Sequence, residues 1–131
     1  MSKKKVLFVC IENACRSQMA EGWAKFFGKD SIDVYSAGSK PALQVDPKAI
    51  EVMKEKGIDI SLQSPKSFKD LPVKDFDYVI TLGCKEICPF LPANEHIEWK
   101  IDDPKGKSID FFRKVRDDIE ERVEKLIKEI S

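Results

Sequence analysis

Apolar runs alternate with segments of helical periodicity along the chain. The apolar runs predict four short strands, at residues 6–9, 32–35, 77–82 and 97–101. Apolar residues at spacings of three and four predict helices at residues 20–27, 47–56 and 112–130, with a shorter one at 67–71. Strands separated by helices form βαβ units. The pattern therefore predicts a single α/β domain, residues 1–131, with a parallel sheet.

Four segments follow the predicted strands directly: residues 10–17, 36–39, 83–92 and 102–106. The carboxyl ends of parallel strands meet at one edge of a sheet, where open α/β proteins bind their ligands. We therefore expect these four segments to line one rim and to hold the functional residues.

The segment 10–17 reads C-I-E-N-A-C-R-S, between a buried strand and a helix. A loop at a helix N-terminus directs backbone N–H groups at an anion, and a cysteine thiol in such a field is easily deprotonated. The planar guanidinium of Arg16 can bind two oxygens of a tetrahedral anion. This phosphate-binding loop predicts Cys10 as a nucleophile. The loop residues expected to contact the anion are Cys10, Ile11, Glu12, Asn13, Ala14, Cys15, Arg16 and Ser17.

Four of these residues have more than one interpretation. Ser17 can donate a hydrogen bond to the Cys10 sulfur, cap the helix, or do both. Asn13 tolerates the positive φ of a tight turn, which favours a structural role. We expect Glu12 to point to solvent, because a carboxylate repels an anion, and Cys15 to be a packing residue.

The sequence I-D-D-P, residues 101–104, supplies a carboxylic acid at the same rim. Pro104 favours an extended backbone at Asp103, which fixes the direction of that side chain. We therefore expect Asp103 to act as a general acid, with Asp102 as the alternative.

Cys84 and Cys88 follow the third predicted strand. Their spacing puts them within disulfide range only if the segment bends into a helical turn. Two thiols on the rim that holds Cys10 favour a redox relay, whereas the alternative is two incidental buried cysteines. A zinc site is disfavoured, since the C-x4-C and C-x3-C spacings differ from those of zinc knuckles.

The charges balance, with 23 basic and 23 acidic residues, which argues against nucleic acid or an anionic membrane as a partner. No apolar segment approaches the roughly 20 residues of a membrane span, and the apolar run after Lys3–Lys5 is too short for a signal peptide. A cytoplasmic location is therefore expected, and cysteines there are reduced at rest.

Together these motifs resemble the thiol-dependent arsenate reductases of the low-molecular-weight tyrosine phosphatase superfamily. The resemblance extends from Lys5 to Ile130. It rests on C-I-E-N-A-C-R-S-Q-M-A-E-G-W (10–23), Y-S-A-G (35–38), P-K-A-I (47–50), I-D-I-S (58–61), V-I-T-L (79–82), D-D-P-K-G-K (102–107) and F-R-K-V-R-D (112–117). The C-x5-R loop alone marks the superfamily, whereas Q-M-A-E-G-W, D-D-P-x-G and the extra cysteines favour the reductase branch.

The resemblance implies a flavodoxin-like three-layer sandwich with a four-stranded parallel sheet. It implies reduction of arsenate to arsenite for arsenic detoxification, with a disulfide relay from Cys10 through Cys84 and Cys88. Thioredoxin is the expected reductant, and glutaredoxin with glutathione is the other. Phosphate and sulfate are expected to compete with arsenate. No metal or organic cofactor is implied, and a monomer is expected.

Two other functions remain open at this point. A low-molecular-weight protein tyrosine phosphatase uses Cys10, Arg16 and Asp103 and needs neither Cys84 nor Cys88. A non-enzymatic anion or redox sensor is oxidised once without a catalytic cycle. Gly83 stands before Cys84, where many relatives place the cysteine itself, which leaves the order of attack and the preferred reductant open.

Overall fold

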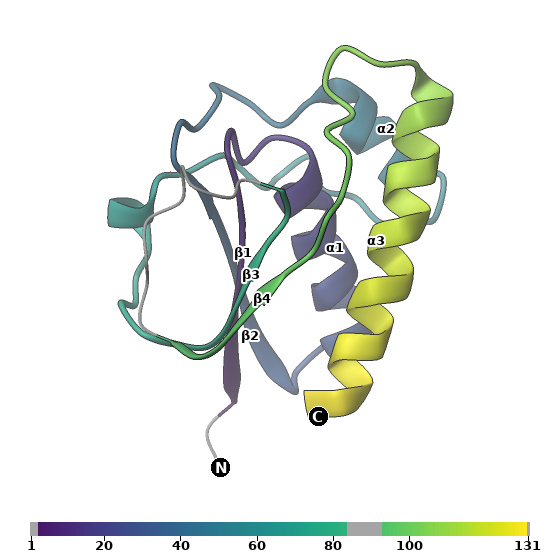
Figure 1. Ribbon diagram of the computed structural model, residues 1–131. Coiled ribbons are helices and arrows are strands. Elements are labelled where there is room, and N and C mark those ends of the chain that lie inside the picture. Colours follow the sequence, from purple (N-terminus) through teal and green to yellow (C-terminus); the bar gives the residue numbers. More distant parts are fainter. Residues whose placement is uncertain (1–2, 84–92, 131) are drawn as a thin grey trace.

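The computed structural model describes residues 3–83 and 93–130 (Figure 1). The elements in chain order are β1 (Lys4–Cys10), α1 (Arg16–Gly28), β2 (Ile32–Gly38), α2 (Pro47–Lys54), the 3₁₀ turn η1 (Phe68–Asp70), β3 (Phe76–Thr81), β4 (Ala93–Glu98) and α3 (Ile109–Ile130). The alternation of strands and helices confirms the predicted α/β class.

The four described strands form one parallel sheet in the order β2-β1-β3-β4. This is the order of the first four strands in flavodoxin-like folds, as predicted. The order reverses between β1 and β3, and ligands of such sheets bind beyond the carboxyl ends of the strands at that point. The register sets Cys10 beside Gly38, and Val9 beside Thr81. The segment that follows β1 therefore lies at the reversal point.

Helices α1, α2 and α3 cover one face of the sheet (Figure 1). Val6 and Phe8 of β1 point into this layer, where Trp23 and Phe112 are buried. The other face, with Leu7, Val9 and Val79, is covered in the described structure by η1 and by Leu71 and Val73. Burial on both faces explains the continuous apolar run of β1.

The second and fourth strands differ most from the sequence prediction. The fourth strand was predicted at residues 97–101 and lies at Ala93–Glu98. It is an edge strand, and its residues Asn94, Glu95 and His96 are exposed, so its composition is polar and hides it from a search for apolar runs. The second strand continues beyond Tyr35 to Gly38, because β1 pairs with it along that whole length.

Helix α2 begins as predicted. The Asp46 carboxylate accepts a hydrogen bond from the Lys48 N–H at 2.9 Å, and Pro47 occupies the first helical position. Helix α3 begins at Ile109, three residues before the apolar face predicted for it. Its buried face packs against α1 and α2, and the long connection before it returns along the rim that carries the loop after β1 (Figure 1).

We predict that Ile119→Ala destabilises the fold by about 2–5 kcal/mol, because it removes a fully buried side chain from the layer between α3 and the sheet. Urea unfolding followed by circular dichroism measures the change. Lys114→Ala, at an exposed position of the same helix, is the control and should change stability by about 0.5 kcal/mol or less. An equal change in both variants would contradict the assignment of this face to the core.

Candidate active site

The loop between β1 and α1 turns its carbonyl groups outward. Four of its carbonyl oxygens accept hydrogen bonds from the segment after β2 and from α1. The pairs are Ile11 with Lys40 N (2.8 Å), Glu12 with Ala42 N (2.9 Å), Asn13 with Gln18 Nε2 (2.9 Å) and Ala14 with Asp46 N (3.0 Å). The described peptide bonds are all trans, so each N–H points away from the carbonyl of the preceding residue. The N–H groups of residues 12–15 therefore face the inside of the loop, where α1 begins and its dipole is positive.

Asn13 fixes the shape of the loop, as the sequence predicts. Its φ is 52°, and its side chain is fully buried. Its Oδ1 accepts a hydrogen bond from Lys66 N at 3.0 Å, and its Nδ2 donates to Ser17 Oγ at 2.7 Å. One side chain thus ties the loop both to the segment before η1 and to the first turn of α1.

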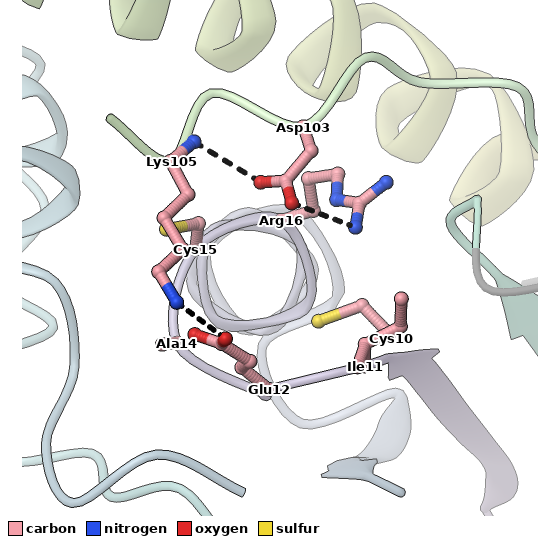
Figure 2. Close-up of a pocket in the computed structure, with 8 residues that line it drawn as sticks. All are labelled: Cys10, Ile11, Glu12, Ala14, Cys15, Arg16, Asp103 and Lys105. Atoms are coloured by element: carbon pink, nitrogen blue, oxygen red, sulfur yellow. Dashed lines mark hydrogen bonds and ion pairs between the residues drawn. The ribbon is translucent and has the colours of Figure 1, made fainter. Parts of the chain in front are cut away.

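Cys10 lies at the end of β1 with its sulfur directed into the loop (Figure 2). The Cys10 Sγ and Ser17 Oγ atoms are 2.8 Å apart. Because Asn13 donates to Ser17, the Ser17 hydroxyl proton is free to point at the sulfur, and it is the donor whenever Cys10 is a thiolate. Of the two predicted roles for Ser17, the structure shows the bond to Cys10, and it shows no side-chain capping bond at the start of α1.

Arg16 is 5% exposed, and its guanidinium lies at the pocket. Its Nη1 donates to the Ile101 carbonyl at 3.0 Å, and its Nη2 lies 3.7 Å from Asp103 Oδ2. A Cβ atom added to Gly83 would collide with Nη1, and the φ of 90° at this position is one that residues with side chains rarely adopt. The ends of β3 and of the segment after β4 therefore hold Arg16 in place.

Asp103 lines the same pocket as Cys10 and Arg16 (Figure 2). Its Oδ1 accepts a hydrogen bond from Lys105 N at 3.0 Å, and Oδ2 faces Arg16. Asp102 lies in the adjoining hollow and does not line this pocket. The geometry favours Asp103 over Asp102 as the acid.

Glu12 lies differently from what the sequence suggests, whereas Cys15 packs in the buried core, as expected. Both line the pocket. Glu12 forms an ion pair with Lys105, so it is not simply a solvated side chain. Cys15 is buried, and its thiol donates to Asp46 Oδ2 at 3.5 Å. Burial and the Asp46 carboxylate raise the pKa of the Cys15 thiol, so it stays protonated.

Cys84 and Cys88 lie outside the described residues. Gly83, the last described residue before them, lies against Arg16 in the hollow that adjoins the pocket. Among residues 3–83 and 93–130, no cluster of three or more His, Cys, Asp and Glu side chains could hold a metal ion. In the same part of the chain, no helix has the length and apolar character that crossing a membrane requires.

Sequence reasoning assigned no role to Lys105, Gly83 or Ile101. The signal for Gly83 was its place at a strand end, where a glycine often marks a close backbone approach. The Ile101 carbonyl and the Lys105 ammonium reach the loop from 85 and 93 residues away in sequence, and spacing does not reveal such contacts.

The sequence model of the low molecular weight phosphotyrosine protein phosphatases matches residues 5–131. The chain belongs to this family. Within it, a Synechocystis protein named glutaredoxin arsenate reductase is 46% identical over 131 residues, covering 98% of this chain and 99% of the relative.

Solved structures of two arsenate reductases are also similar to the present chain. One, described as an arsenate reductase in the phosphate binding state, has a TM-score of 0.88 at 44% identity, over 98% of this chain and 99% of that one. The other is the thioredoxin-dependent arsenate reductase of Corynebacterium glutamicum. It has a TM-score of 0.79 at 33% identity, over 98% of this chain and 62% of that one.

We predict that Gly83→Ala weakens binding of inorganic phosphate about tenfold or more, the cost of one charge-assisted hydrogen bond, because the new Cβ displaces the Arg16 guanidinium. Calorimetric titration measures the affinity. Gly106→Ala is the matched control: its φ of 77° imposes similar strain, but nothing lies within 4 Å of the new Cβ. Equal losses in the two variants would attribute the effect to strain alone.

We predict that Cys15 resists alkylation by iodoacetamide in the folded protein at pH 8, because its raised pKa keeps the thiol protonated and burial restricts access. Mass mapping after digestion measures the labelled fraction. The same reaction in urea should label Cys15 fully. Rapid labelling of the native protein would contradict the buried, protonated state.

Proposed function

We propose that this chain reduces arsenate to arsenite, with the Cys10 thiolate as the nucleophile. The observation that carries the proposal is the convergence of the Cys10 sulfur, the inward N–H groups of residues 12–15 and the Arg16 guanidinium on one small pocket. The names of the relatives at 33–46% identity, all arsenate reductases, support the same reaction.

The ligand class follows from the donors. The pocket offers several N–H groups and one guanidinium, which suit a tetrahedral oxyanion that carries charge on several oxygens. Arsenate and phosphate share this shape. The related structure in a phosphate binding state supports such a ligand. Phosphate and sulfate therefore compete with arsenate for the pocket.

In the first chemical step the Cys10 thiolate attacks arsenic, and a sulfur–arsenic bond forms. One arsenic–oxygen bond breaks, and Asp103 supplies the proton with which that oxygen leaves as water. Ser17 stabilises the thiolate before attack through the 2.8 Å contact, and Arg16 holds two of the remaining oxygens.

The second step reduces arsenic. The Cys84 thiolate attacks the Cys10 sulfur, arsenite leaves with the electron pair of the sulfur–arsenic bond, and a Cys10–Cys84 disulfide forms. Cys88 then attacks the Cys84 sulfur, which releases Cys10 as a thiolate and leaves a Cys84–Cys88 disulfide. The place of Gly83 against Arg16, in the hollow beside the pocket, supports this order, because Cys84 is the next residue along the chain.

Thioredoxin reduces the final disulfide by exchange in this proposal, as the name of the Corynebacterium relative supports. The Synechocystis relative is named a glutaredoxin arsenate reductase, so glutaredoxin with glutathione is the alternative reductant to be tested. The protein acts as a monomer in the cytoplasm, and it requires no metal or organic cofactor.

Hydrolysis of phosphate monoesters is the second candidate, favoured by the description of the family. It uses Cys10, Arg16 and Asp103 and ends with attack of water on a phosphorylated Cys10. Replacement of Cys84 and Cys88 therefore distinguishes the two functions.

We predict that Cys88→Ser completes about one turnover of arsenate and then stops, because its Cys10–Cys84 disulfide has no internal thiol to resolve it. Arsenite release and mass mapping measure the turnover and the trapped bridge. Cys84→Ser should stop at the first step, whereas hydrolysis of para-nitrophenyl phosphate should persist in both variants.

Oxidation of NADPH with arsenate, thioredoxin and thioredoxin reductase measures the complete cycle in the unsubstituted protein, and exchange for glutaredoxin and glutathione identifies the reductant. Continued NADPH oxidation with arsenate in the variant that carries both Cys84→Ser and Cys88→Ser would reject the relay. Hydrolysis of para-nitrophenyl phosphate by that variant, together with no arsenate reduction by the unsubstituted chain, would support the phosphatase function. A Cys10–Cys15 bridge in Cys88→Ser would reject Cys84 as the attacking thiol.

A further inference from the structure

An ion pair between Glu12 and Lys105 joins the two segments that line the anion pocket. Glu12 belongs to the loop after β1, and Lys105 belongs to the segment before α3. Figure 2 shows the Lys105 side chain running from its own segment to Glu12, along the side of the pocket opposite Cys10. Both residues line the pocket.

The pair contributes little to folding, because its side chains are 56% and 36% exposed. Its consequence is local. An isolated carboxylate at residue 12 would repel an anion in the loop, and the Lys105 ammonium cancels that charge. Glu12 in turn raises the pKa of Lys105, so the lysine stays protonated.

The second link across the pocket has a different character. Arg16 is buried and faces Asp103, on the other side of the opening from the Glu12–Lys105 pair (Figure 2). The Arg16–Asp103 link belongs to the chemistry, whereas the Glu12–Lys105 pair carries no group that the reaction uses. The Glu12–Lys105 pair lines the pocket and is partly exposed, so it lies at the pocket opening, called the mouth below, where part of a larger ligand would extend.

We infer, resting on the proposed reduction of arsenate, that the Glu12–Lys105 pair is a specificity-determining lip that admits free inorganic oxyanions and disfavours aryl phosphate monoesters. A free oxyanion places all its oxygens among the loop N–H groups and Arg16. A monoester carries in addition an aromatic ring that extends through the mouth. The ring then lies against an ion pair and removes water from two charges without replacing their hydrogen bonds.

Selection of this kind is a penalty on the wrong ligand rather than a gain for the right one. The lip therefore lets an anion site common to both chemistries favour arsenate over esters of the same charge. An apolar lip of the same size would bind the ring instead.

The test compares inorganic phosphate with phenylphosphonate, an aryl probe that cannot be hydrolysed, by calorimetric titration of the chain with its cysteines reduced. The double variant Glu12→Gln with Lys105→Met keeps the side-chain length at residue 12, shortens that at residue 105 by one atom, and removes both charges. We expect the ratio of the phenylphosphonate Kd to the phosphate Kd to fall about tenfold relative to the unsubstituted chain. A ratio within about twofold of the unsubstituted chain would overturn the inference.

Lys107→Met is the matched control, because it removes a positive charge two residues away, where Nζ lies 5.9 Å from the Phe111 ring centroid and outside the pocket. Its ratio should stay at the unsubstituted value, and a fall equal to that of the double variant would show that loss of any nearby lysine charge suffices and would reject the pair as the cause. The reversed pair, Glu12→Lys with Lys105→Glu, should restore the unsubstituted ratio. A ratio equal to that of the neutral double variant would reject the pair as the cause.

These titrations require no turnover, so they separate the lip from the proposed reaction. If arsenate causes no NADPH oxidation in the presence of this chain and either reductant system, the proposed function is rejected, even if the Kd ratio falls as expected. If the unsubstituted chain reduces arsenate and the Kd ratio is unchanged in the double variant, the proposed function stands and the inference about the Glu12–Lys105 pair is rejected.

Discussion

The site depends on where the carbonyl groups of the loop after β1 are bonded. Each peptide is planar, so binding a carbonyl on the outside commits the next N–H to the inside. Backbone N–H groups at Lys40, Ala42 and Asp46 and the side chain of Gln18 bind those carbonyls. The segment after β2 is thus as much a part of the anion site as the loop itself, although it supplies no reacting atom. Gly38 permits the close approach, since a Cβ there would lie 2.5 Å from the Ile11 carbonyl oxygen.

The need for hydrogen-bond partners also explains the position of the charged side chains. Arg16 is buried, and a buried guanidinium needs partners for its donors. The Ile101 carbonyl takes one donor, Asp103 lies near another, and Gly83 leaves room for both contacts. The groups that restrain Arg16 therefore come from the ends of β3 and of the segment after β4. The proposed nucleophile, anion ligand and acid meet because three strand ends of one parallel sheet meet.

Much of this arrangement could be predicted from the sequence. The C-x5-R spacing predicts the loop, Asp46–Pro47 predicts the start of α2, and I-D-D-P places an acid at the rim. These signals are local, because each is contained within a few residues. The position of β4 could not be predicted, since an edge strand with one exposed side carries no apolar run. The Glu12–Lys105 pair joins residues 93 positions apart, and only the folded sheet brings them together.

Reduction and hydrolysis begin from the same covalent chemistry, so the pocket floor cannot decide between them. A thiolate, an oxyanion and an acid suffice to form a sulfur–arsenic or a sulfur–phosphorus bond. The outcome depends on what reaches the Cys10 sulfur next. Water attacks phosphorus and leaves the thiol unchanged, whereas a second thiol attacks sulfur and removes two electrons from the protein. In the proposed function, an opening that disfavours aryl esters and a cysteine joined directly to Gly83 both favour the second event. On this proposal, the residues that decide between reduction and hydrolysis lie at the edge of the pocket and beside it, whereas Cys10, Arg16 and Asp103 serve both reactions.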